Sequence, residues 1–274
     1  MKAIEYKVLY NSIVKDYIKE NVSKKFLRHL KNMNVKYYLN DRLVKNYEEI
    51  YKDDILRIEY EEDNIKDNHL YDIPLNILYE DNHYMVLNKP SGLKTIPTGY
   101  NDFKSLYNAV LSYFIKNKID GTIHFINRLD KDTEGLLIVA KDKYSAAILS
   151  KNLCNINKYY IAECSGIIKD NGIIDAPIKK GDGIKRVVDS TGKKSITEYE
   201  VIRIKDNTTI LKLKLLSGRC HQIRVHLSSI GHPIIGDSLY GSGTKLHLTS
   251  YILDFVDPFN ESEMHLEIKP WFGE

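Results

Sequence analysis

Residues 127–141 read Asn-Arg-Leu-Asp-Lys-Asp-Thr-Glu-Gly-Leu-Leu-Ile-Val-Ala-Lys, a charged loop that runs directly into an apolar segment. The run from Leu136 to Ala140 has the length and composition of a buried strand. A carboxylate at the edge of such a strand can be held rigidly and directed at a substrate, as a nucleophile requires. Asp130 is therefore the first candidate for a catalytic residue. A surface ion pair or an Asx turn would give the same local pattern.

A second block runs from Ser217 to Asp237 and contains His-Gln-Ile-Arg-Val-His at residues 221–226. Its apolar residues recur at helical spacing and predict a helix over residues 223–230. On spacing alone, Arg224 would lie on the exposed face of that helix.

Together the two blocks resemble the RluA-type family of RNA pseudouridine synthases. The usual motifs of that family read His-Arg-Leu-Asp-x-x-Thr-Ser-Gly-Leu-Leu and Gly-Arg-Thr-His-Gln-Ile-Arg-x-His-Leu. Weaker signatures lie at residues 77–93, at residues 158–166 and at Leu246-His247. The resemblance therefore extends over about residues 74–256.

The resemblance implies isomerisation of uridine to pseudouridine in structured RNA. Asp130 matches the family nucleophile, Arg224 its cationic partner, and Tyr160 the tyrosine whose ring stacks on the target base. Arg128 is expected to stabilise the position that the flipped-out uridine vacates. The reaction has no net redox change and loses no group, so we expect no cofactor and no metal. The chemical route taken by the carboxylate stays open.

Two other functions stay open at this point. A non-catalytic RNA-binding protein could keep the fold without the chemistry, although the presence of all three proposed catalytic residues argues against it. A glycosidase would need a second acid near Asp130. Asp132 is the nearest acid in the sequence, but no motif supports that role.

This chain departs from the usual motifs at three positions. Asn127 replaces histidine, Glu134 replaces serine, and Cys220 replaces threonine. None of these changes removes a residue with a proposed chemical role, and Asn127 can still form a hydrogen bond. The added charge of Glu134 bears on substrate preference more than on catalysis.

Composition describes a globular protein, with 274 residues of which 43% are hydrophobic and 28% are charged. No apolar run is long enough for a membrane span and no secretory segment is recognisable, so we expect a cytoplasmic protein that does not bind membranes. The cysteines Cys154, Cys164 and Cys220 show no paired spacing, which argues against disulfides and zinc sites. A monomer is the default expectation.

The N-terminal region has a segregated charge. Residues 21–40 contain five basic residues and no acid, whereas residues 41–72 are rich in acids. A helix beginning after Ser23 would bury Phe26 and Leu30 and expose its cations. The order of helix and short strands resembles an S-four-like RNA-binding module, which makes candidate RNA-binding residues of Lys24, Lys25, Arg28 and Lys31. A merely solvated basic helix face is the alternative.

The polar stretch from residue 61 to residue 69 reads as a linker. We therefore expect an RNA-binding module with its linker over residues 1–68 and a catalytic domain over residues 69–274. Such a module suits a large folded substrate, which favours ribosomal RNA of the large subunit over tRNA as the partner.

The larger part is expected to be α+β with a mixed, largely antiparallel sheet. Periodicity predicts strands near residues 85–87, 136–140, 159–163, 196–204 and 209–216, and helices over 103–116, 144–152 and 223–230. A basic hairpin around residues 179–194 is expected to contact phosphates, unless it is only solvated. Lys185, Arg186, Arg219 and His221 complete the candidate RNA-binding residues.

Overall fold

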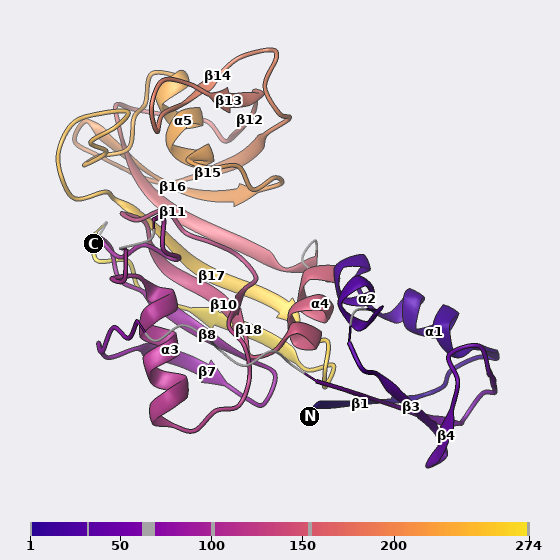
Figure 1. Ribbon diagram of the computed structural model, residues 1–274. Coiled ribbons are helices and arrows are strands. Elements are labelled where there is room, and N and C mark those ends of the chain that lie inside the picture. The colour runs from indigo at the N-terminus through magenta and orange to yellow at the C-terminus, as the bar shows by residue number, and fades with distance from the viewer. Residues whose placement is uncertain (1, 32, 62–68, 100–101, 153–154, 273–274) are drawn as a thin grey trace.

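Two β-sheets organise the chain, as the ribbon diagram shows (Figure 1). The computed structural model describes residues 2–31, 33–61, 69–99, 102–152 and 155–272. A four-stranded sheet belongs to the N-terminal part and a ten-stranded sheet to the remainder. The expected linker lies largely outside the described residues, so the boundary at residue 68 stays a prediction.

The N-terminal sheet is antiparallel, with the order β1 (Lys2–Lys7), β6 (Ile55–Tyr60), β3 (Lys36–Leu39) and β4 (Arg42–Val44). Two helices, α1 (Val14–Asn21) and α2 (Lys24–Lys31), pack on it, and β2 (Ser12–Ile13) pairs with β5 (Glu49–Ile50). The expected N-cap is present, because the Phe26 N–H donates to Ser23 Oγ at 3.2 Å.

The large sheet runs in the order β12 (Gly172–Asp175), β15 (Ile196–Lys205), β16 (Thr208–Leu215), β11 (Asn157–Ser165), β17 (Leu248–Val256), β10 (Glu134–Ala140), β8 (Tyr84–Lys89) and β7 (Asn76–Glu80). In addition, β18 (Glu263–Glu267) pairs with β17, and β9 (His124–Phe125) pairs with β10. Within the described part of the chain, β10 and β17 form a parallel pair, and the other strand pairs of this sheet are antiparallel. The predicted α+β class with a mixed, largely antiparallel sheet is confirmed.

Three helices accompany this sheet: α3 (Leu106–Lys116), α4 (Lys143–Lys151) and α5 (Gln222–Ser229). The first begins later than residue 103, because the Ser105 side chain caps it by accepting from the Asn108 N–H. A separate hairpin of β13 (Ile178–Lys180) and β14 (Arg186–Val188) forms where the basic hairpin was expected.

Successive side chains along the strands of the large sheet point to opposite faces and belong to two separate hydrophobic cores. Leu87, Leu137 and Leu213 belong to one core, together with residues of α3 and α5. Val86 and Ile138, one position away, belong to the core on the other face. The strands therefore present one face toward α5, which carries the second sequence motif.

Helix α4 lies beside α2 and packs against the N-terminal part of the chain, as Figure 1 shows. Its Ala147 is buried in the core of the N-terminal part, and its Tyr144 packs against Tyr6 and Phe26 with ring centroids 6.4 and 5.9 Å apart. Among the described residues, no helix is long and apolar enough to cross a bilayer.

Candidate active site

The loop that carries Asp130 is fixed from several directions. Thr95 Oγ1 donates to the Leu129 carbonyl at 2.7 Å, and Ser91 Oγ donates to the Asp132 carbonyl at 2.8 Å. The Asp130 side chain itself is 27% exposed. The carboxylate is thus accessible to a substrate while the backbone around it is held in place.

Lys89 forms the third restraint on this loop. The residue is fully buried, and its Nζ donates to the carbonyls of Pro90, Leu93 and Lys131 at 2.9, 2.7 and 3.0 Å. Burial lowers the pKa of Lys89 to about 8, against the opposing effect of nearby carboxylates, Asp130 first among them. The sequence placed Lys89 in the weaker signature at residues 77–93 but did not indicate which groups its ammonium would bind.

The residues that follow the Asp130 loop form β10, and three of them or their neighbours fix its position in the sheet. Gly135 has φ of 118°, and an added Cβ would overlap the backbone of Ser250 on the parallel neighbour β17. Asn127 Oδ1 accepts from the Ile138 N–H at 2.9 Å, so the residue that replaces histidine does form a hydrogen bond. Glu134, which stands where the family motif has serine, accepts a hydrogen bond through Oε1 from Thr249 Oγ1 at 2.9 Å. This bond connects the start of β10 to β17.

Arg224 reaches this loop from α5 and is buried rather than exposed. Its Nη1 lies 3.9 Å from Asp130 Oδ2. Its stronger partner is Asp237, which accepts from Nε at 2.8 Å and from Nη2 at 2.7 Å. Arg224 thus lies beside Asp130 as expected of its partner, and the sequence did not indicate that a bidentate pair with Asp237 orients the guanidinium while the remaining nitrogen faces Asp130.

Asp237 was missed as a site residue, although it ends the second sequence block. It is fully buried and also accepts from the backbone N–H groups of Leu239 and Tyr240 at 2.9 and 3.1 Å. These donors and Arg224 hold the pKa of Asp237 below its usual range, although burial acts in the opposite direction. A charged carboxylate is thus maintained behind Arg224.

His221 lies beside Asp130, with Nε2 3.9 Å from Oδ2. Its backbone is left-handed, with φ of 57° at the start of α5. Nδ1 is 2.8 Å from Tyr240 Oη. Burial lowers the pKa of His221, with Asp130 opposing, so the imidazole is neutral at neutral pH. The sequence suggested an RNA contact here, whereas His221 borders the candidate nucleophile itself.

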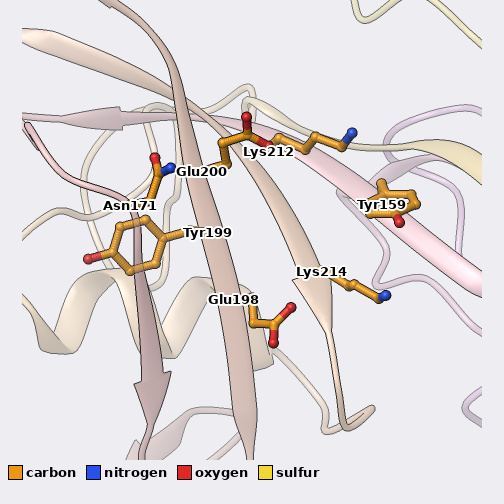
Figure 2. A pocket seen from close by; sticks show the side chains of 7 residues that line it. All are labelled: Tyr159, Asn171, Glu198, Tyr199, Glu200, Lys212 and Lys214. Carbon is orange, nitrogen blue, oxygen red and sulfur yellow. The ribbon is translucent and has the colours of Figure 1, made fainter.

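Tyr160 points from β11 into the core on the α5 side and is buried. Burial raises the pKa of Tyr160 to about 12, and the charge of Asp130 adds to this rise. Its neighbour Tyr159 lies on the opposite face. Figure 2 shows Lys212 and Lys214 extending toward the Tyr159 ring, with Nζ 4.6 and 5.6 Å from its centroid.

A basic groove adjoins the site between the β13–β14 hairpin and the segment before α5. It has a volume of about 420 Å³ and is lined by Lys179, Lys180, Arg186, Lys193 and Arg219, among others, and it extends to Cys220. The Arg186 N–H donates to Tyr240 Oη at 2.7 Å, which links the hairpin to the His221 pair. The groove can attract phosphates.

The other predicted RNA-binding residues have different surroundings. Arg128 is exposed on the loop of Asp130, and Lys185 is exposed in the turn of the hairpin. Lys24, Arg28 and Lys31 are exposed on α2, which Figure 1 shows well apart from α5. The Lys25 side chain lies outside the described part of the structure. The α2 cations therefore do not contribute to the geometry around Asp130.

One group of side chains near Asp130 could hold a metal ion. Asp130, Cys220 and His221 offer ligand atoms that lie within 4.8 Å of one another. Of the cysteines, Cys164 is buried and free, Cys220 is exposed and free, and Cys154 lies outside the described residues. The sequence gave no indication of this group, because Asp130 is distant along the chain.

The chain is similar to proteins of known family. Residues 83–229 match the family model described as RNA pseudouridylate synthase. The chain is 34% identical over 263 residues to a Bacillus subtilis protein named uncharacterized RNA pseudouridine synthase YjbO, which covers 92% of this chain and 93% of that protein. It is 33% identical over 236 residues to the ribosomal large subunit pseudouridine synthase D of Xylella fastidiosa, over 84% of this chain and 71% of that protein.

A solved structure shares the fold. The human RNA pseudouridylate synthase domain containing 1 protein superposes with a TM-score of 0.60 at 24% sequence identity. The superposition covers 72% of this chain and 83% of the human chain.

Proposed function

This chain belongs to the RNA pseudouridylate synthase family and is an RNA pseudouridine synthase, and from that premise we propose that it isomerises uridines of large-subunit ribosomal RNA with Asp130 as nucleophile. The family resemblance and the isomerase class expected from the motifs are confirmed. The choice of ribosomal RNA is supported by relatives named for the large subunit, such as the Xylella fastidiosa protein.

The reaction determines which groups the site must supply. The bond between C1′ of the ribose and N1 of uracil breaks, the base turns, and a bond forms between C1′ and C5. A proton leaves C5 and a proton is bound at N1, so the product is an isomer of the substrate. An ionised carboxylate close to the ribose and base is the main requirement.

The observation that carries the proposal is the 3.9 Å approach of Arg224 Nη1 to Asp130 Oδ2, with Arg224 itself held by Asp237. A guanidinium at this distance attracts the carboxylate electrostatically and leaves its oxygens available to a substrate. Attack on the sugar, addition to the base and elimination are the three routes open to the Asp130 carboxylate.

Tyr160 and His221 flank the proposed nucleophile. The Tyr160 hydroxyl stays protonated at neutral pH, because its pKa is about 12, so it can donate a proton or a hydrogen bond to the turning base. Stacking of an aromatic ring on a base contributes about 1–3 kcal/mol. The neutral His221 can accept a hydrogen bond from the RNA without adding charge beside Asp130.

The target uridine must leave its stack before it can reach Asp130, at a cost of a few kcal/mol. Exposed Arg128, two residues before Asp130, is the proposed contact with the strand that remains. The basic groove next to the site would bind flanking phosphates. The exposed cations of α2 would bind more distant phosphates of a large folded RNA, as an S-four-like module does.

Pseudouridine mapping of ribosomal RNA and tRNA tests this proposal in cells that lack the protein. Cells complemented with the wild type should regain one or a few sites in large-subunit ribosomal RNA, and cells complemented with Asp130→Asn should not. Loss of sites in tRNA alone would replace the proposed substrate. No change at any site, or full rescue by Asp130→Asn, would favour a non-catalytic RNA-binding role.

A further inference from the structure

Asp130, Cys220 and His221 bring three different metal-binding atoms to one point. The ligand atoms lie within 4.8 Å of one another, and His221 Nε2 is 3.9 Å from Asp130 Oδ2. It is the one such group of three or more found among the described residues. Tetrahedral zinc, with bonds of about 2.0–2.3 Å, holds its ligand atoms about 3.3–3.7 Å apart. The three side chains therefore need to close by only about 1 Å to share an ion.

The chemistry of this set selects the class of metal. A cysteine thiolate, an imidazole nitrogen and a carboxylate oxygen are the ligands of zinc and similar thiophilic divalent ions. Magnesium and calcium prefer sites made of oxygen atoms alone. The Cys220 thiol is free and exposed, so it is accessible to an incoming ion.

The His221 imidazole is already oriented as a ligand. Nδ1 lies 2.8 Å from Tyr240 Oη, so an Nδ1–H can donate to that oxygen while Nε2 remains free on the side of Asp130. A histidine ligand in metalloproteins is oriented by such a hydrogen bond from its second nitrogen. The left-handed backbone of His221 fixes the turn from Cys220 into α5.

Three arginines, Arg224, Arg186 and Arg128, lie near the proposed ligands and oppose a bound cation, so the anionic ligands must outweigh them. Arg224 Nη1 lies 3.9 Å from Asp130 and opposes a second cation there. The charge of Arg224 is offset by its buried bidentate partner Asp237. Metal binding releases the Cys220 proton, so the ion meets two anionic ligands, Cys220 and Asp130.

We propose that Asp130, Cys220 and His221 form a binding site for a thiophilic divalent cation, for which zinc is the best fit, and that the bound ion inhibits the enzyme by occupying the Asp130 carboxylate. Three protein ligands leave a fourth position open, which is the arrangement of an exchangeable zinc site rather than a closed structural one. The inhibition rests on the proposed role of Asp130, whereas the binding does not.

Calorimetric titration of the full chain with zinc chloride tests the binding. The wild type should bind one equivalent and release about one proton per ion, measured in two buffers of different ionisation enthalpy. Cys220→Ser should weaken zinc binding at least about tenfold. Even the loss of a residue that only hydrogen-bonds a metal ligand lowers metal affinity by about 10–100-fold. His265→Gln is the matched control, because His265 lies on the surface beside Asp254 and Glu267. Equal zinc affinity in wild type and Cys220→Ser, or no binding by either, overturns the proposed site.

The inhibition is tested separately by assaying pseudouridine formation at increasing zinc concentration. Wild type should lose activity and recover it with a chelator, and Cys220→Ser should need at least about tenfold more zinc for the same loss. Comparing variants at one RNA concentration removes the effect of zinc bound to RNA. Equal inhibition of both variants overturns the inhibitory role even if binding differs. If Asp130→Asn proves fully active, the proposed nucleophile fails while the calorimetric result for Cys220 still stands.

Discussion

Arg224 and Asp237 form a buried bidentate ion pair, with Nε 2.8 Å from Oδ2 and Nη2 2.7 Å from Oδ1. The third nitrogen of the same guanidinium faces Asp130 at 3.9 Å. The guanidinium beside the proposed nucleophile is thus oriented by a residue 13 positions farther along the chain. Two carboxylates share one arginine: Asp237 is buried and makes the bidentate pair, whereas the Asp130 side chain is 27% exposed.

Asp237→Asn should destabilise the protein strongly, because the buried Arg224 loses its bidentate partner and keeps only Asp130, 3.9 Å away, as an anionic neighbour. Breaking a buried pair in this way costs about 3–5 kcal/mol of unfolding free energy. Urea denaturation of wild type and variant measures the loss. Asp254→Asn is the control, since its pair with His265 lies at the surface and should leave the unfolding midpoint unchanged. Similar midpoints for Asp237→Asn and wild type would show that the pair is not needed to hold Arg224.

Tyr160→Phe should lower kcat by about 10²-fold if the hydroxyl takes part in proton transfer as proposed. The wild-type hydroxyl remains protonated until the pH approaches its pKa of about 12, so this group causes no loss of activity between neutral pH and that value. Tyr159→Phe is a matched control on the opposite face, beside Lys212 and Lys214 (Figure 2). Equal rates for the two variants would remove Tyr160 from the chemistry.

Lys89→Met should destabilise the loop of Asp130, because three carbonyls lose their common donor. An unsatisfied buried polar group costs about 1–3 kcal/mol. Lys94→Met serves as the control, because Lys94 pairs with Asp102 at a more exposed position. Denaturant melts that do not distinguish the two variants would contradict this role.

The stability contributed by Lys89 should also depend on pH in a defined direction. Its pKa is about 8 in the folded chain and near its ordinary value of 10.5 in the unfolded chain. Between these values the unfolded chain binds more protons, so stability from this group increases as the pH rises through the window and is lowest below it. The difference in unfolding free energy between wild type and Lys89→Met should therefore grow from pH 8 to pH 10.5. A constant or shrinking difference would contradict the lowered pKa.

Neutralising two cations of the basic groove should reduce the salt dependence of RNA binding. Each lost phosphate contact lowers the slope of log affinity against log salt by about 0.7–0.9, so Lys180→Ala combined with Lys193→Ala should lower it by about 1.5. Lys212→Ala on the outer face of the sheet is the matched control. Filter binding at several salt concentrations measures the slopes. An unchanged slope for the double variant would place the RNA elsewhere.

Local patterns in the sequence predicted much of the fold. The apolar run at Leu136 to Ala140 became β10, the spacing of Ile223 and Leu227 became α5, and Ser23 caps α2. Each of these features depends on residues close together in the chain, where periodicity and capping chemistry act directly.

The geometry of the site could not be predicted in the same way. The pairing of Arg224 with Asp237 and the use of Lys89 to hold the Asp130 loop depend on contacts made through space, which no periodicity encodes. The parallel pairing of β10 with β17 brings Ser250 against Gly135, and only the folded chain identifies Ser250 as the backbone that approaches this glycine closely. The motifs predicted Asp130 as the nucleophile, which stays a prediction, and did not indicate the residues that position its neighbours.

The most direct test of the central claim is an in vitro assay of pseudouridine formation in large-subunit ribosomal RNA from cells that lack the protein. Purified wild type should form pseudouridine at a defined site, whereas Asp130→Asn should form none while still binding the RNA with similar affinity. Pseudouridine formation by Asp130→Asn at a rate close to that of wild type would contradict the role of Asp130 as nucleophile.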